Sequence, residues 1–256
     1  MQHLAGGSAM SQKDQQSIKP VAELIPAGCS VCGVRQYGIC KALRSADLFR
    51  FANSTRRRKV AHGETITFEE DEVVDYANIV SGSVKLTKLL SDGRQQIVGL
   101  QFAPEFIGRP FSENVTVSAE AATDVELCVF PKTEFEKMLR EQPDFEHQLL
   151  EQTLVNLDDA RTWMVTLGRK TAQEKVASFL LLLASHIGKS KEENTGHKLF
   201  SLPLKRADIA DFLGLTIETV SRQMTKLRKT GVISVERNLE ITLHDARLLK
   251  QLAGDD

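Results

Sequence analysis

Long apolar runs are absent from this sequence of 256 residues. Its most apolar stretch, VASFLLLLASHI, is shorter than the roughly 18 residues that a membrane-spanning helix needs. The first twenty residues lack the basic region followed by an apolar region that marks a secretory signal peptide. We therefore expect a cytoplasmic protein with no membrane partner.

An excess of charge of one sign is also absent, since 33 Lys and Arg residues nearly balance 34 Asp and Glu residues. This excludes a general polycation that binds nucleic acid over its whole surface, so any basic surface must be local. No phosphate-binding Gly-x-x-x-x-Gly-Lys loop occurs, and the six His residues form no recognisable catalytic or zinc-binding pattern. The sequence does not predict an enzyme.

Cysteine is scarce, with four residues, but three of them fall within CSVCGVRQYGIC at 29–40. Thiols stay reduced in a cytoplasmic protein, which favours metal or redox chemistry over a disulfide framework. Four thiolates are the ligand set of an iron–sulfur cluster. They also suit structural zinc or a thiol–disulfide switch. The candidate metal ligands are Cys29, Cys32, Cys40 and Cys128.

Cys128 lies far downstream in a strand-like segment, VELCVF. Side chains alternate between the two faces of a strand, so Cys128 shares a face with Glu126 and Phe130, opposite Leu127. This argues weakly against an ordinary core cysteine, which is otherwise the commoner role of a free thiol. In the upstream segment, the glycines permit a close backbone wrap, and Arg35 and Lys41 offset negative charge.

The pattern along the chain predicts an α+β protein of several parts. Short alternating runs with glycine turns predict an antiparallel β-roll or jelly roll. The predicted parts are a tail with the cysteine segment at 1–45, the β-roll at 46–140, a long helix at 141–169, and a helical region ending in a hairpin at 170–256.

The long helix carries an apolar seam with the seven-residue repeat of paired helices. Length and position favour a homodimer interface over a helix that packs only on its own domain. Asp158 and Asp159 flank the seam and would approach their copies in a parallel dimer, which predicts a marginally stable interface. The predicted dimerisation residues are Leu150, Leu157, Ala160, Met164 and Leu167.

The segment 205–233 predicts a helix-turn-helix. A first helix at 206–213 ends at Gly214, and Thr216 caps a second helix that ends near Gly231. A following hairpin would form a wing. On the second helix, one face is expected to be buried, comprising Ile217, Val220, Met224 and Leu227.

The opposite face of this second helix is polar and suits a major groove. Arg222 has the planar fork that reads guanine, Glu218 can accept from a base amino group, and Ser221 can reach a base edge or a phosphate. Further DNA contacts, mostly to phosphates, are expected from Lys205, Arg206, Thr225, Lys226, Arg228, Lys229 and Arg237.

The stretch DIADFLGLTIETVSR resembles the recognition segment of the CRP/FNR superfamily of transcription regulators, and ETVSR resembles its FNR branch. The spacing C-x2-C-x7-C resembles the alphaproteobacterial FnrL/FnrN-like members. The resemblance implies an oxygen sensor whose [4Fe–4S] cluster, held by the four cysteines, promotes a homodimer. That dimer would bind a palindromic promoter site resembling TTGAT-N4-ATCAA and contact RNA polymerase through the β-roll.

The β-roll of this superfamily often binds a cyclic nucleotide through an Arg that follows a Gly-x-x-Glu turn. Here Arg109 lies at the turn itself and the next Arg is Arg140, so we expect no cyclic nucleotide. The basic run TRRRK at 55–59 is interpreted as a solvated face. The alternative to an oxygen-responsive regulator is a zinc- or disulfide-stabilised β-roll module that acts mainly in partner binding.

Overall fold

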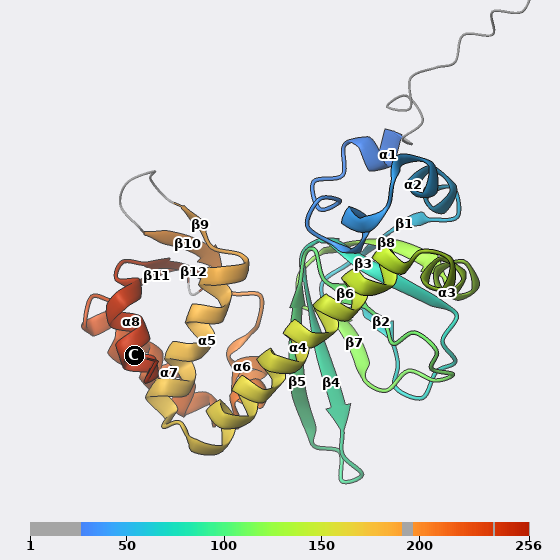
Figure 1. Ribbon diagram of the computed structural model, residues 1–256. Coiled ribbons are helices and arrows are strands. Elements are labelled where there is room, and N and C mark those ends of the chain that lie inside the picture. The colour runs from blue at the N-terminus through green and yellow to red at the C-terminus, as the bar shows by residue number, and fades with distance from the viewer. Residues whose placement is uncertain (1–26, 191–196, 238, 256) are drawn as a thin grey trace, which may run out of the picture.

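The computed structural model describes residues 27–190, 197–237 and 239–255. A β-roll capped by short helices is joined to a C-terminal region by one long helix, α4 (Pro143–Arg169), which runs diagonally across Figure 1. This architecture confirms the predicted fold class of an antiparallel β-roll, a long helix and a C-terminal winged helix-turn-helix. No helix in these described ranges is both long enough and apolar enough to cross a membrane.

The β-roll consists of two four-stranded antiparallel sheets, ordered β1-β8-β3-β6 and β2-β7-β4-β5. Apolar side chains from both sheets, including Ile79, Val84 and Leu127, fill the space between them. The strands are β1 (Arg56–Val60), β2 (Thr65–Thr67), β3 (Asp75–Ser81), β4 (Ser83–Leu89), β5 (Gln95–Phe102), β6 (Phe106–Ile107), β7 (Ser118–Ala121) and β8 (Val125–Pro131).

The turn between β3 and β4 requires glycine. Gly82 has φ +90°, and a Cβ atom there would lie 2.3 Å from the backbone oxygen of Asp124. A side chain would therefore force apart the two segments that this turn brings together.

Short helices cover the outer face of the β1-β8-β3-β6 sheet: α1 (Ala27–Ser30), η2 (Ile39–Ala42), α2 (Ser45–Ala52) and α3 (Lys132–Glu141). An aromatic cluster joins them to β8 and α4. Phe51 stacks on Phe130 with ring centroids 4.9 Å apart, and its ring also meets the edge of Phe145 at 5.5 Å. The start of α4 is thereby anchored beneath the cysteine segment.

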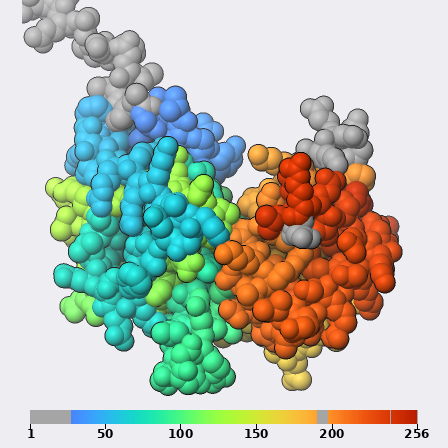
Figure 2. All heavy atoms as spheres, turned by 180° about the vertical axis from the view of Figure 1, so that it is seen from behind, coloured from blue at the N-terminus to red at the C-terminus, as the bar shows by residue number. Residues whose placement is uncertain are grey.

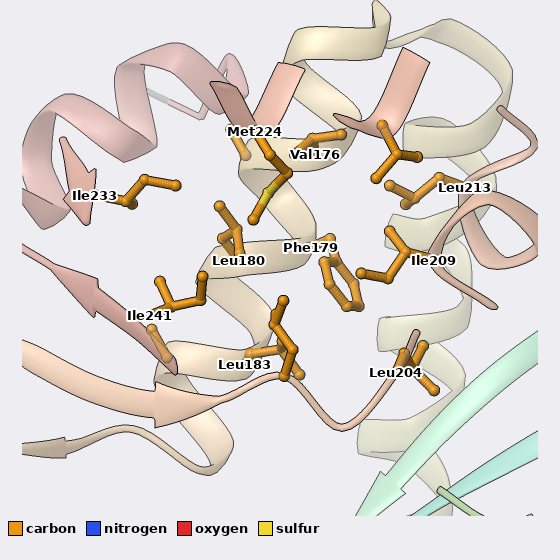
Figure 3. Packing of buried hydrophobic residues seen from close by; sticks show 14 of the residues in the cluster. Val176, Phe179, Leu180, Leu183, Leu204, Ile209, Leu213, Met224, Ile233 and Ile241 are labelled. Atoms are coloured by element: carbon orange, nitrogen blue, oxygen red, sulfur yellow. The ribbon is translucent and has the colours of Figure 1, made fainter. Parts of the chain in front are cut away.

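The C-terminal region has its own core around α5 (Ala172–His186), shown in Figure 3. Phe179 and Leu183 are fully buried there with Ile209 and Ile241. The other elements are β9 (Lys189–Ser190), β10 (Lys198–Ser201), α6 (Arg206–Leu213), α7 (Ile217–Lys229), β11 (Ile233–Glu236), β12 (Glu240–Leu243) and α8 (Ala246–Ala253).

The region differs from the sequence-based expectation at its margins. The predicted hairpin exists as β11 and β12, but β10 and β9 extend it to a four-stranded sheet. The chain does not end in the hairpin, because α8 follows, capped by Asp245, whose carboxylate accepts from the Leu248 N–H at 2.8 Å. Leu249 and Ala253 of α8 are fully buried in the core around α5.

The two bodies seen in Figure 2 touch where α6 packs against β5. Lys85 of the β-roll is buried between two carboxylates, with Nζ 2.9 Å from Glu120 and 3.1 Å from Asp208 of α6. The side-chain amide of Gln96 donates to the Asp211 carbonyl at 2.7 Å. Polar as well as apolar contacts therefore hold the helix-turn-helix on the β-roll.

Candidate functional site

The helix-turn-helix consists of α6, a three-residue turn and α7, with the boundaries that the sequence predicted. Gly214 ends α6 in the left-handed conformation at φ +60°, which glycine adopts without strain. The Thr216 hydroxyl accepts from the Thr219 N–H at 3.2 Å and so caps α7. The relative orientation of the two helices is thus set by residues close in sequence.

One face of α7 packs into the core through Val220, Met224 and Leu227, as predicted. Ile217, predicted on the same face, is not buried, since 47% of it is exposed. It is the first residue of α7, about one turn before Val220. The periodicity that places a residue on a face cannot report whether anything lies against that face.

The predicted base-reading side chains Glu218, Ser221 and Arg222 are all exposed on the opposite face of α7. Hydrogen bonds from its own backbone N–H and from Thr216 lower the pKa of Glu218, so its carboxylate is ionised. The guanidinium of Arg222 lies along the surface of α7, with its Nη2 atom 3.5 Å from the Thr219 hydroxyl. A charged acceptor and a charged donor therefore project from one helix surface.

The predicted supporting contacts are less uniform. Lys205 and Lys226 are exposed, and Lys226 donates to the Gln173 side chain. The Thr225 hydroxyl donates to the Ser221 carbonyl at 2.9 Å. Arg206 is half-buried, and burial lowers its pKa, but the guanidinium stays charged and is simply less accessible to a phosphate than expected. Exposed positive charge also comes from Arg228, Lys229 and Arg237.

The cysteine segment is held by turns rather than by long elements. Cys29 lies in α1 and Cys40 in η2, and the Cys32 N–H bonds the Cys29 carbonyl at 3.4 Å. Of the glycines in 28–38, a Cβ atom would be crowded at Gly38, 3.1 Å from the Pro104 oxygen, but not at the other two. The close wrap expected of all these glycines occurs at one of them.

The Cys128 side chain lies on the face of β8 that the strand pattern predicted. It packs with Cys40 against the aromatic cluster, on the opposite side of β8 from the core of the roll. All four described cysteines are free. The structure therefore brings Cys128 to the upstream segment from a remote part of the chain.

Electrostatic coupling shows that the four thiols share one neighbourhood. Burial, together with smaller contributions from Cys128, Cys29 and Cys32, raises the pKa of Cys40 to about 12. Burial also raises the pKa values of Cys29 and Cys128, and Cys32 adds to both rises. Because thiolates are the ligands, metal or cluster binding here has to release protons.

Two arginines oppose this accumulation of negative charge. Arg35, expected from the sequence, lowers the pKa of Cys29 and Cys40. Arg57, in the run interpreted as a solvated face, lowers the pKa of Cys29 and Cys128. The missed signal lay in the pairing of Arg57 with Cys128 across β1 and β8, which the sequence does not reveal.

The four thiols lie in one neighbourhood but do not converge as the ligands of one ion. Within the ranges described, no three His, Cys, Asp or Glu side chains converge on a point that could hold a metal ion. Asn78, which pairs with Cys128 across the sheet, is buried with its Oδ1 atom unpartnered in the described structure. Because directly opposite residues of paired strands share a face of the sheet, this amide lies on the same side as the Cys128 thiol.

The long helix leaves most of its predicted seam uncovered. Leu150, Leu157 and Met164 are 52%, 45% and 73% exposed, Ala160 is exposed, and Leu167 is half-buried. Further apolar side chains that the seven-residue repeat did not include are exposed beside it: Leu154, Val155 and Val165.

The charges beside the seam are exposed too. Asp158 forms an ion pair with Arg161 at 3.0 Å within the helix, whereas Asp159 contributes to the electrostatics of Glu105 on the β-roll. The upstream end of the helix meets the cysteine segment, because η2 packs against α4. The apolar face of α4 is thus available to a partner and mechanically connected to Cys40.

Comparison with known proteins matches two separate parts of the chain to protein families. Residues 57–142 match the cyclic nucleotide-binding domain family, and residues 174–252 match the Crp-like helix-turn-helix domain family. A probable transcriptional activator of Rhizobium leguminosarum bv. viciae is 50% identical over 89% of this chain and 93% of its own. The chain belongs to the CRP/FNR family of transcription regulators.

Other relatives agree with this CRP/FNR assignment. The transcriptional activator protein FnrL of Cereibacter sphaeroides is 40% identical over 89% of this chain and 92% of its own length. The solved structure of FixK2 from Bradyrhizobium japonicum superimposes with a TM-score of 0.71, at 30% identity over 77% of this chain and 96% of that chain. Because these relatives are transcription regulators, they confirm the prediction that the protein is not an enzyme.

The CRP/FNR β-roll of this chain contains a cavity of about 150 Å³ between its sheets. Small-molecule pockets usually exceed about 300 Å³. Tyr76 crosses the region and donates from its hydroxyl to Glu136 at 2.7 Å. Side chains that line the cavity include Arg58, Tyr76, Gln101, Arg109, Asn114 and Leu127.

Proposed function

We propose that this protein is an oxygen-responsive transcription activator of the FNR type that holds a [4Fe–4S] cluster with Cys29, Cys32, Cys40 and Cys128. One observation carries the proposal: thiols from two distant segments meet beside the start of α4. Four thiolates are the ligand set that such a cluster takes. The cluster, when bound, would supply the sensitivity to oxygen.

A cluster and a zinc ion would hold the same four thiols at different spacings. A tetrahedral zinc ion with Zn–S distances of about 2.3 Å draws its sulfur ligands to about 3.8 Å of each other. A four-iron cluster is wider and keeps its ligand sulfurs further apart. Relatives at 40% identity are named both FnrL and FixK, so the proposal rests on the cysteines rather than on identity.

The chain itself provides a route from the cysteines to DNA binding. Cys40 lies in η2 next to Ile39, which is fully buried in the cluster that contains Phe145 of α4. Ligation at Cys40 would hold η2 against α4 and favour the orientation that pairs its exposed face with a second copy. Loss of ligation would remove that support, and linkage then lowers DNA affinity by the same free energy.

A homodimer would place two copies of α7 against a palindrome resembling TTGAT-N4-ATCAA. Dimeric helix-turn-helix proteins bind half-sites about one helical turn apart. Arg222, Glu218 and Ser221 would read bases, and the surrounding cations would contact phosphates. The β-roll would contact RNA polymerase at the promoter.

We also infer that the β-roll does not bind a cyclic nucleotide. The cavity volume is small, and Arg109 lines it from the segment just after β6, not from the strand beyond the turn. Isothermal titration with cAMP and cGMP should give no heat of binding. Micromolar binding of either nucleotide would contradict this inference.

Anaerobic purification followed by assays of iron, acid-labile sulfide and zinc tests the main proposal. We expect about four irons and four sulfides per chain, in keeping with one [4Fe–4S] cluster. Air should release them and convert the dimer to a monomer in analytical ultracentrifugation. Zinc without sulfide would instead support the second candidate, a zinc-stabilised module for partner binding, and a stable disulfide after mild oxidation would support a thiol switch.

A further inference from the structure

The guanidinium of Arg57 lies beneath the cysteine segment. Its Nη2 donates to the Gly28 carbonyl at 3.3 Å, next to Cys29. Its Nη1 lies 3.4 Å from the Glu126 carboxylate of β8. In the antiparallel pairing of β1 with β8, Arg57 is directly opposite Cys128. One side chain thus touches the upstream segment and the strand that carries the remote thiol. In Figure 1, β1 accordingly lies just below α1.

Its electrostatic partners are the thiols themselves. Arg57 forms a hydrogen bond with Cys32 and lies close to Cys128 and Glu126. Because a guanidinium is not deprotonated in proteins, it carries a full positive charge in this partly buried position. A charge so placed attracts thiolates more strongly than one in bulk water does.

The neighbouring arginines of the same strand are directed elsewhere. Arg56 pairs with Asp75 of β3 at 2.6 Å, and Arg58 donates to the Ile66 carbonyl at 3.4 Å and lines the cavity inside the roll. Alternation along β1 explains the difference, since residues one apart face opposite sides of the sheet. The run of three arginines therefore contains one that serves the cysteine segment.

We propose that Arg57 is a positioning residue of the cysteine site, which clamps the Cys29–Cys32 turn onto the strand of Cys128 and offsets the negative charge of the ligated thiolates. The proposal rests on the proposed function insofar as a cluster is the group being held. A [4Fe–4S] core with four thiolates is an anion in its usual oxidised state. Outer-shell hydrogen bonds and net charge are among the factors that tune such sites.

The test compares Arg57→Gln with Arg57→Lys and with a matched control, Arg56→Gln, which removes the same charge from the other face of β1. The first readout is hydrogen exchange of residues 27–40 in the metal-free protein, followed by mass spectrometry. We expect faster exchange in Arg57→Gln, and exchange like that of the unmodified protein in Arg56→Gln. Arg57→Lys should be intermediate, because it keeps the charge and loses the planar fork.

The second readout is the anaerobic rate of iron loss to a chelator from the reconstituted protein. Removal of an outer-shell partner typically weakens metal retention about 10- to 100-fold, so Arg57→Gln should lose iron at least about tenfold faster. If Arg57→Gln matches Arg56→Gln in both measurements, the clamp is wrong even though the cluster stands. If the unmodified protein takes up zinc without sulfide, the cluster is wrong, and hydrogen exchange still decides whether Arg57 is a clamp.

Discussion

The two functional ends of the molecule are built in opposite ways. In the helix-turn-helix, α6 buries four of its eight residues, and both helices begin and end at local capping signals. In the cysteine segment, Gly38 and Ile39 are the buried residues within 28–42, while Val31 and Tyr37 are 84% and 71% exposed. The helix-turn-helix is preformed by its own core, whereas the cysteine segment has little core and, under the proposed function, would depend on ligation. Elements with few buried contacts open most easily, which suits a switch.

The largest effect is expected from a substitution in the core of the C-terminal region. Phe179→Ala removes a fully buried ring from α5 and should lower the free energy of unfolding by about 3–5 kcal/mol. Urea denaturation would measure this with and without oxygen, and the loss should be similar in both. Phe68→Ala is the control, because that ring is 59% exposed on the β-roll, and it should cost less than about 0.5 kcal/mol.

A substitution in the cysteine segment should instead change DNA affinity strongly and the free energy of unfolding little. Cys40→Ala should abolish cluster assembly and lower anaerobic DNA affinity about 100-fold, which corresponds to about 2.7 kcal/mol. Its unfolding free energy without a cluster should change little by comparison with Phe179→Ala. The matched control is the metal-free unmodified protein, whose DNA affinity should equal that of the variant. An anaerobic variant that still binds DNA tightly would contradict the proposed role of ligation.

On α7, substitutions of Arg222 and Lys229 would distinguish base contacts from phosphate contacts. Arg222→Ala should cost about 1–3 kcal/mol on the cognate palindrome and relax specificity at the guanine position. Lys229→Ala should weaken binding to all sequences alike and reduce the salt dependence by about one ion. Fluorescence anisotropy over a set of half-site variants would measure both. An equal loss across all sequences for Arg222→Ala would make Arg222 a phosphate contact instead.

The smallest effect is expected at Glu105, which lies between the two ends. Burial raises its pKa from 4.5 to about 7, Asp159 of α4 adds to the rise, and a bond from the Phe102 N–H opposes it. The stability gained from the protonated group is complete below about pH 4.5 and is lost as pH rises through about 7.

Urea denaturation between pH 5 and 8 should therefore show stability falling with pH by no more than about 2 kcal/mol through this group. Glu105→Gln should flatten the profile. Glu134→Gln is the control, because Glu134 is an exposed carboxylate of α3, away from the surface pocket that Glu105 lines. An unchanged profile in Glu105→Gln would assign the pH dependence to other groups.

Features set by neighbours in sequence were predictable. The stop at Gly214, the cap at Thr216 and the outward face of Cys128 each follow from a backbone preference or from strand alternation, and the structure confirms them. Backbone sterics and the period of a strand act over a few residues, so a short stretch of sequence already contains their cause.

Features set by distant segments were decided only in the tertiary structure. The register of β1 on β8 places Arg57 opposite Cys128, the packing of η2 on α4 puts Cys40 beside the long helix, and the start of α7 leaves Ile217 exposed. Strand register and helix docking come from the summed burial of many side chains, and no local pattern records that sum. The sequence by itself determined which residues can bind DNA or a cluster, and the fold decided which of them meet.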